Sequence, residues 1–174
     1  MIITRRYDLV LAIYPNTRGF AFVLFEGALA PVDWGIVKVN SEEKNRDSIR
    51  RIAQLLGRFT PEALVLQDMS ENGARRARRI RDLNEAIAVL AETQGVPAFQ
   101  YSSGTVREQF ASFGMSGKRG IAEAIAKQIP MLARFLPPVR KIWMSEDARM
   151  GLFDATALAL TFFYRDTLGE TRAA

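Results

Sequence analysis

The sequence contains no cysteine and no histidine among its 174 residues. Catalysis by a cysteine nucleophile, a Ser-His-Asp triad or an imidazole base is therefore excluded, and so are zinc fingers. Any reaction must rely on carboxylates, lysine, hydroxyl groups or a hard metal ion bound through oxygen. The absence of cysteine fits a reducing compartment, and it is equally compatible with export.

Long apolar runs are absent as well. The chain has no stretch of about 18 apolar residues, and no cationic segment followed by an apolar one marks a secretory signal. We therefore expect a cytoplasmic protein without a membrane partner. The length, with 48% hydrophobic residues, fits one domain over residues 1–174, and no repeat or linker divides it.

Basic residues exceed acidic ones. Lysine and arginine number 24 against 19 aspartates and glutamates, which gives a formal net charge of +5, and the pI is near 9.9. A basic chain of this kind favours a polyanionic partner, chiefly nucleic acid. A basic protein without such a partner is the alternative interpretation.

Short apolar runs alternate with amphipathic segments along the chain. Strands are expected at residues 8–14, 20–25, 32–39, 63–66 and 96–101, the first two joined as a hairpin. Helices are expected at residues 41–58, 73–93, 104–113, 119–134 and 145–168, the first capped by Asn40 and Glu43 in a capping box. This order predicts an α/β fold, with a five-stranded mixed sheet and helices on both faces.

Three carboxylates are expected on the last helix. Asp147 and Asp154 are two helical turns apart and would share one face, while Glu146 and Asp147 also suit the first turn after an N-cap at Ser145. Asp154 lies in the apolar segment "GLFDATALALTFF", where a charge is costly unless it is paired or used. Asp154 is therefore the strongest candidate for a site residue.

A polar pair ends the fourth strand in "ALVLQDMS". The carboxyl end of a central strand is where such sheets place ligands. Alternation along the strand puts Gln67 and Asp68 on opposite faces. If the first and fourth strand ends face each other, Tyr14 and Gln67 are the site candidates, and Asp68 reaches the site only if the strand has already ended.

Two basic segments are candidates for phosphate contacts. The run "ARRARRIRD" places Arg75, Arg76, Arg78 and Arg79 at the start of a helix. Its alternative interpretation is a solvated helix face with Arg78–Asp82 and Arg81–Glu85 pairs.

The turn "SGKRG" could hold a phosphate with Lys118 and backbone N–H groups, or it is an ordinary turn between helices. It lacks the spacing of a Walker loop, so nucleotide hydrolysis of that kind is rejected. Further along the chain, Trp143 is expected to lie in the core rather than to stack on a base.

Several segments together resemble RuvC-type Holliday junction resolvases of the ribonuclease H-like superfamily. They are the turn "PNTRG", the strand end "VLQD", the segment "PAFQYSSGTVREQFASFGMSGKRGIAEAIA" and the last helix "FDATALALTFF", within residues 8–164. The resemblance implies a sheet of order 3-2-1-4-5, a homodimer and a site for two Mg²⁺ ions. Those ions would be held by an Asp on the first strand, a Glu ending the fourth, and one or two Asp on the last helix.

The resemblance places these ligand positions on Tyr14, Gln67 (with Asp68 adjacent), Gly151 and Asp154. Lys118 or Arg119 would stand where such resolvases keep a basic residue near the scissile phosphate. Only Asp154 retains a carboxylate. A tyrosine phenol titrates near pH 10 and an amide does not titrate, so neither residue offsets the charge of Mg²⁺.

Three interpretations follow. The first is a protein that binds DNA, especially branched DNA, with a degenerate or weak nuclease site; its expected contacts are Arg18, Arg75, Arg76, Arg78, Arg79, Lys118 and Arg119. The second is an active structure-selective endodeoxyribonuclease dependent on Mg²⁺ or Mn²⁺, with catalytic residues Asp154, Asp147, Glu146 and Asp68 and metal ligands Asp154 and Asp68. The third is a protein-interaction module that keeps only the fold.

Overall fold

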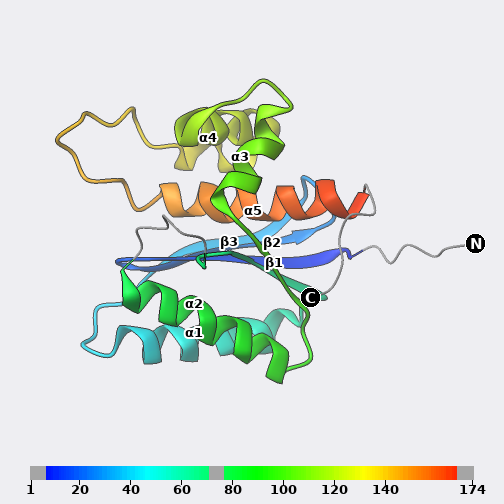
Figure 1. The fold of residues 1–174 in the computed structure, drawn as a ribbon, viewed down its shortest axis with the longest axis vertical. Helices are drawn as coiled ribbons and strands as arrows, with labels where there is room; N and C mark the ends of the chain where they lie inside the picture. The colour runs from blue at the N-terminus through cyan, green and yellow to red at the C-terminus, as the bar shows by residue number, and fades with distance from the viewer. Residues whose placement is uncertain (1–6, 71–76, 168–174) are drawn as a thin grey trace, which may run out of the picture.

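A computed structural model describes residues 7–70 and 77–167. Its strands are β1 (Leu9–Asn16), β2 (Gly19–Glu26), β3 (Pro31–Lys38), β4 (Ala63–Gln67) and β5 (Ala98–Tyr101). Its helices are α1 (Lys44–Phe59), α2 (Arg78–Thr93), α3 (Ser103–Ala111), α4 (Gly117–Gln128) and α5 (Met150–Thr167), with a 3₁₀ helix η1 (Pro130–Phe135). Figure 1 shows the sheet between two helical layers, α1 and α2 on one face and α5 on the other, with α3 and α4 stacked on α5.

The sheet has the order β3-β2-β1-β4-β5. β1 pairs antiparallel with β2 and parallel with β4, while β4 and β5 are parallel. This confirms the expected mixed sheet and its strand order. The carboxyl ends of β1 and β4 lie at the same edge of the sheet, because parallel neighbours run in the same direction.

Side-chain alternation along β1 divides the core into two layers. Val10, Ala12 and Tyr14 pack with α5, and Leu11 and Ile13 pack with α1 and α2. α5 is the most buried helix, because it lies between the sheet and α4. Within residues 150–163, Asp154 alone is not fully buried. None of the helices in the described ranges is long and apolar enough to cross a membrane.

The β1–β2 turn is tighter than the sequence indicated. Both strands continue through "PN" and "GF", and the Asn16 side-chain oxygen accepts the N–H groups of Arg18 and Gly19 at 2.9 and 3.0 Å. A Cβ at Gly19 would lie 2.1 Å from the Val37 carbonyl oxygen, and φ there is +154°. Glycine is therefore required where this turn approaches β3.

Several expected helix boundaries are wrong. α1 begins at Lys44 and is preceded by Glu43, without a side-chain cap, so the Asn40 capping box does not form. α4 stops at Gln128 because Pro130 cannot continue an α-helix, and the chain continues as η1. The last helix begins at Met150 rather than at residue 145. The expected start of the second helix at residue 73 lies outside the described residues.

Candidate functional site

Tyr14 and Gly151 face each other where β1 meets the start of α5. The Tyr14 side chain is buried, at 6% exposure. A Cβ at Gly151 would lie 3.1 Å from Asn16 Nδ2, 3.3 Å from Ala21 Cβ and 4.0 Å from Tyr14 Cδ1. A large aromatic residue on the strand thus faces a helix position that has no side chain and little room for one.

Lys118, in the first turn of α4, joins the acidic residues at this place. Its Nζ lies 3.1 Å from Asp154 Oδ2 and also forms an ion pair with Glu146 Oε1. The same ammonium lies 5.9 Å from the centroid of the Tyr14 ring. We refer to Tyr14, Lys118, Glu146, Gly151 and Asp154 as the Lys118 cluster.

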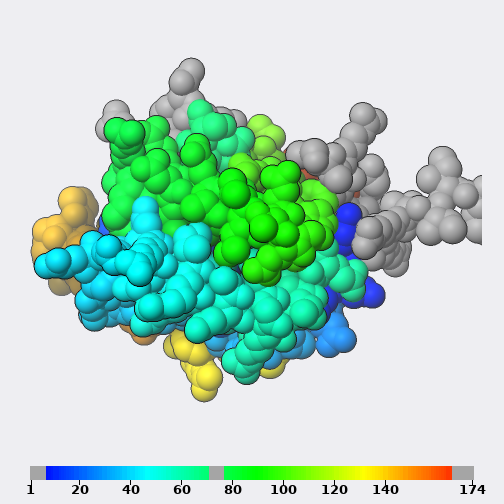
Figure 2. Space-filling view, turned by 90° about the horizontal axis from the view of Figure 1, so that it is seen from below, coloured from blue at the N-terminus to red at the C-terminus, as the bar shows by residue number. Residues whose placement is uncertain are grey.

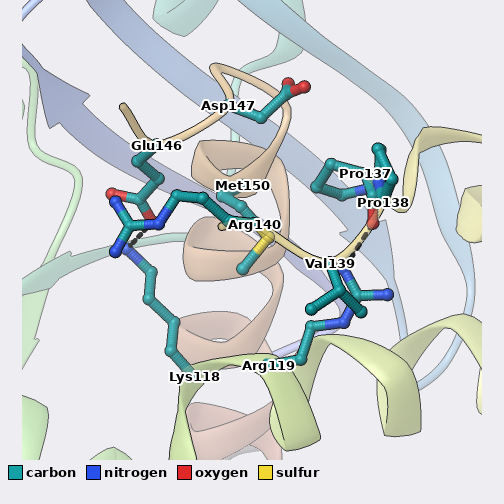
Figure 3. A pocket seen from close by; sticks show the side chains of 9 residues that line it. All are labelled: Lys118, Arg119, Pro137, Pro138, Val139, Arg140, Glu146, Asp147 and Met150. Atoms are coloured by element: carbon teal, nitrogen blue, oxygen red, sulfur yellow. Dashed lines mark hydrogen bonds and ion pairs between the residues drawn. The ribbon is translucent and has the colours of Figure 1, made fainter. Parts of the chain in front are cut away.

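The Lys118 cluster explains why the charged residue Asp154 is tolerated in the apolar helix α5. The Asp154 side chain is only 16% exposed, so its carboxylate needs a partner, and the Lys118 ammonium supplies one. Figure 3 shows Lys118 extending from α4 to Glu146 across a pocket of about 240 Å³. The pocket is lined by Lys118, Arg119, Pro137, Pro138, Val139, Arg140, Glu146, Asp147 and Met150.

Asp147 does not share a helix face with Asp154, because it precedes α5. Its carboxylate accepts the Arg149 backbone N–H at 2.9 Å and the Arg149 guanidinium at 2.9 and 2.7 Å. These bonds, chiefly that from the Arg149 side chain, lower the pKa of Asp147 to about 2, and the charge of Arg18 adds to the effect. Asp147 therefore stabilises the turn before α5, since its carbonyl also accepts the Met150 N–H.

The end of β4 holds Gln67 and Asp68 in separate interactions. The Gln67 carbonyl accepts a hydrogen bond from the Asn84 side chain at 2.8 Å. The Asp68 carboxylate accepts the N–H and hydroxyl of Ser70 at 2.9 and 2.5 Å. Within residues 7–70 and 77–167, no group of three or more acidic side chains is placed to hold a metal ion.

The donor set therefore does not fit the two-Mg²⁺ site that the resemblance implied. Tyr14, Gln67 and Gly151 carry no carboxylate, and the carboxylates of Glu146 and Asp154 share one ammonium. Two hard cations need several anionic oxygens converging on them. Here the carboxylates of Glu146 and Asp154 meet at the Lys118 ammonium, while those of Asp147 and Asp68 are bonded to Arg149 and Ser70.

The basic residues of the second helix differ in what they contact. Arg78 is largely exposed and forms the expected pair with Asp82, at 3.9 Å. Arg79 donates instead to Asn45 Oδ1 at 3.0 Å and to the carbonyl oxygens of Asn16 and Thr17 at 3.5 and 3.4 Å. Arg79 thus ties α2 to α1 and to the β1–β2 turn. Arg75 and Arg76 lie outside the described residues.

Arg119 anchors the segment between η1 and α5, which we call the 136–149 loop. Its Nε bonds Glu123 Oε1 at 2.9 Å, and its Nη1 donates to the Pro137 carbonyl. Figure 3 shows this contact beside Lys118. Both cations of the "SGKRG" turn therefore have partners within the protein. Arg18 is exposed in the β1–β2 turn, on the side of Asp147.

The 136–149 loop contains the feature that the sequence interpretation missed. Trp143 was expected in the core, but its side chain is 80% exposed, and Ile142 beside it is 100% exposed. That expectation is wrong because the residues lie in a turn, closed by the Met144 N–H on the Lys141 carbonyl at 3.0 Å.

Comparisons with known proteins agree with this architecture. No family model matches the chain. A crossover junction endodeoxyribonuclease RuvC from Trichlorobacter lovleyi is 28% identical over 160 residues, covering 87% of this chain and 82% of that protein.

Solved structures share the fold at lower identity. Thermus thermophilus RuvC in complex with a Holliday junction substrate has a TM-score of 0.69 at 20% identity, covering 97% of this chain and 100% of that one. Thermus thermophilus RuvC alone gives 0.66 at 22% identity, covering 95% and 99%. The yeast mitochondrial Holliday junction resolvase gives 0.59 at 12%, covering 91% and 80%. In sequence and in fold, this chain is a homologue of the RuvC Holliday junction resolvases, with a ribonuclease H-like fold.

Proposed function

We propose that this chain binds DNA, branched DNA in particular, and that its nuclease site is degenerate. The RuvC fold supports the binding half of the proposal, because one solved structure with that fold is a complex with a Holliday junction. The Lys118 cluster supports the other half. The observation that carries it is the Lys118 ammonium, paired with both Asp154 and Glu146.

The charges of the cluster make a two-metal site unfavourable. Two unit charges about 4 Å apart interact by about 4 kcal/mol at an effective dielectric constant of about 20, so an ammonium would oppose a divalent ion there by about 8 kcal/mol. Asp154 alone keeps its carboxylate among the four family ligand positions. A metal ion would have to displace Lys118 and would then find few anionic ligands.

A second function has one observation in its favour. The carboxylates of Glu146 and Asp154 converge on a single atom, Lys118 Nζ. If Lys118 moved away, the same two carboxylates could bind a single Mg²⁺ or Mn²⁺ ion in its place. The alternative is therefore an endodeoxyribonuclease that needs Lys118 to leave the site, with Asp154 and Glu146 as its metal ligands.

Binding of DNA and of metal can be measured separately. Fluorescence anisotropy with a labelled four-way junction should show tighter binding than with linear duplex of equal length. Calorimetric titration with Mn²⁺ should show no saturable binding up to millimolar concentrations in the wild type. Equal and weak affinity for both DNAs would contradict the first part, and saturable Mn²⁺ binding that disappears in Asp154→Asn would contradict the second. An absence of any DNA binding would favour a protein-interaction module.

A further inference from the structure

We propose that the tip of the 136–149 loop, Ile142 and Trp143, contacts unstacked nucleobases of bound DNA. The inference rests on the proposed function, and it adds the chemical group that is recognised and the residues that recognise it. The tip projects from the body of the protein beyond α5 (Figure 1), and Figure 2 shows the loop at the edge of the molecule.

The tip exposes large apolar side chains that lie outside the hydrophobic core. Ile142 is 100% exposed and Trp143 is 80% exposed, and Val139 nearby is 72% exposed. Ile142 and Trp143 occupy the central positions of a turn closed between Lys141 and Met144. Such positions normally hold glycine, asparagine, aspartate or proline, so the turn itself does not require isoleucine and tryptophan there.

The base of the loop is held firmly at both ends. Arg119 donates to the Pro137 carbonyl at one end, next to the paired prolines 137 and 138. At the other end, Glu146 pairs with Lys118, and Asp147 with Arg149. The tip is therefore presented at a defined place, so less conformational entropy is lost when it binds.

The positive charge of the loop indicates that the partner bound at the tip is a nucleic acid. Arg140 and Lys141 are exposed beside the tip, and the Lys141 ammonium lies 5.3 Å from the centroid of the Trp143 ring. An aromatic ring flanked by cations can stack on a base while the cations contact the adjacent phosphates. Arg140 and Val139 also line the pocket of the Lys118 cluster, so a base held at the tip would place its strand near that cluster.

Unstacked bases occur at single strands and at branch points, but not within a continuous duplex. The prediction is therefore selective. Loss of Trp143 should weaken binding to a four-way junction and to single-stranded DNA about fivefold or more, since stacking on one base is worth about 1–3 kcal/mol. Binding to linear duplex, which depends on phosphate contacts, should change by less than about twofold.

The experiment uses the full chain and the two tryptophans, Trp34 and Trp143. A Trp34→Phe variant leaves Trp143 as the only tryptophan, and its selectively excited emission should be quenched by oligo(dT) and by the junction, but not by duplex. Affinities are then compared for Trp143→Ala, Trp143→Phe and Val89→Ala. Val89 is a matched control, because it is 61% exposed on the opposite layer, in α2. The phenylalanine variant should retain most of the affinity.

The outcomes separate this inference from the proposed function. If Trp143→Ala and wild type bind junction and single strand equally, the inference is overturned while DNA binding stands. If neither protein binds any DNA, the proposed function fails and the inference with it. Self-association or vesicle binding that depends on Trp143, without quenching by DNA, would assign the tip to another partner and also overturn the inference.

Discussion

Lys118 is the residue on which the cluster depends. It reaches from α4 to Asp154 on α5 and to Glu146 in the 136–149 loop, and its ammonium lies near the ring of Tyr14. One side chain therefore neutralises a carboxylate in a buried helix and fixes the position of a loop. An ammonium has the charge to do this without any metal ion, although it offers none of the chemistry of one.

Removal of this ammonium should cost stability. Lys118→Met removes the ammonium that lies 3.1 Å from the Asp154 carboxylate, whose side chain is only 16% exposed, and we expect the free energy of unfolding to fall by about 1–2 kcal/mol. The loss is smaller than for a fully buried pair because the Lys118 side chain is 44% exposed. Urea denaturation at pH 7 measures it.

The matched control is Lys127→Met, an exposed lysine in the last turn of the same helix. It should change stability by less than about 0.5 kcal/mol. The double variant Lys118→Met/Asp154→Asn should recover part of the loss, since no uncompensated charge remains. Equal effects of the two lysine variants would contradict a structural role for Lys118.

Asp147 should titrate at unusually low pH. Its pKa is lowered to about 2, chiefly by the hydrogen bond from the Arg149 side chain. A lowered pKa means that its stabilisation of the turn is complete above the ordinary value near 3.8 and is lost as the pH falls through about 2. The carboxyl ¹³C shift of Asp147 should therefore have its midpoint near pH 2.

In Arg149→Gln the Asp147 midpoint should rise toward its ordinary value, because the largest cause of the shift is removed. In the wild type, the turn should not respond to pH changes near neutrality, because Asp147 stays ionised there. A wild-type midpoint close to 3.8 would show that the Asp147–Arg149 pair does not persist in solution.

At the scale of elements, α5 lies unusually close to β1 and β2 at Gly151. A Cβ there would lie 3.3 Å from Ala21 Cβ, and the strand bearing Ala21 is held in the sheet on both sides. Gly151→Ala should therefore lower the free energy of unfolding by about 1 kcal/mol, despite the better helix propensity of alanine. Thermal or urea denaturation measures the change.

Gly120→Ala is the control, since Gly120 lies inside α4 and a Cβ there would meet no atom within 4 Å. It should raise stability by about 0.5–1 kcal/mol, the propensity gain alone. A stabilising Gly151→Ala would mean that α5 is not packed as closely as the structure has it. Such a result would also mean that position 151 has room for the aspartate that the family resemblance places there.

The elements were predicted from the sequence more successfully than their ends. Apolar runs located the five strands, because buried strands have few alternatives, and the family resemblance implied their order. The start of α5 was misjudged since an acid following a serine is typical of a first turn, whereas Asp147 is bound by Arg149. Trp143 was misplaced because apolar character predicts burial, and only the turn at residues 141–144 shows otherwise.

The site was predicted residue by residue but not as an arrangement. Asp154 was identified as a costly charge and Lys118 as a candidate for a phosphate contact, yet they are partners across 36 residues of chain, a pairing that no local pattern encodes. The contacts of Arg79 were not predicted for the same reason, since its partners Asn16 and Asn45 lie on other elements. Contacts between distant segments depend on helix placement, which sequence periodicity does not determine.

Across the whole molecule, the excess positive charge is divided between structural and exposed cations. Arg79, Lys118 and Arg119 bond to other parts of the chain and Arg149 bonds to Asp147 in its own turn, whereas Arg78 and Arg140 are exposed. The exposed ones are the better candidates for phosphate contacts, because they are available without breaking the fold.

Arg78→Gln and Arg140→Gln should each reduce the slope of log K against log salt concentration for junction binding by about 0.9, the value for one phosphate contact. Arg79→Gln should instead lower thermal stability, since it removes bonds that join three elements. Anisotropy titrations at several salt concentrations measure the slopes. Unchanged slopes in both exposed variants would remove these residues from the DNA interface.

Under the proposed function, this RuvC homologue binds DNA junctions without cleaving them. The direct measurement is a single-turnover incubation of a labelled four-way junction with excess protein, in Mg²⁺ and in Mn²⁺, with binding recorded in the same samples. We expect a fully bound junction that remains intact. Strand cleavage by the wild type that is lost in Asp154→Asn would contradict it.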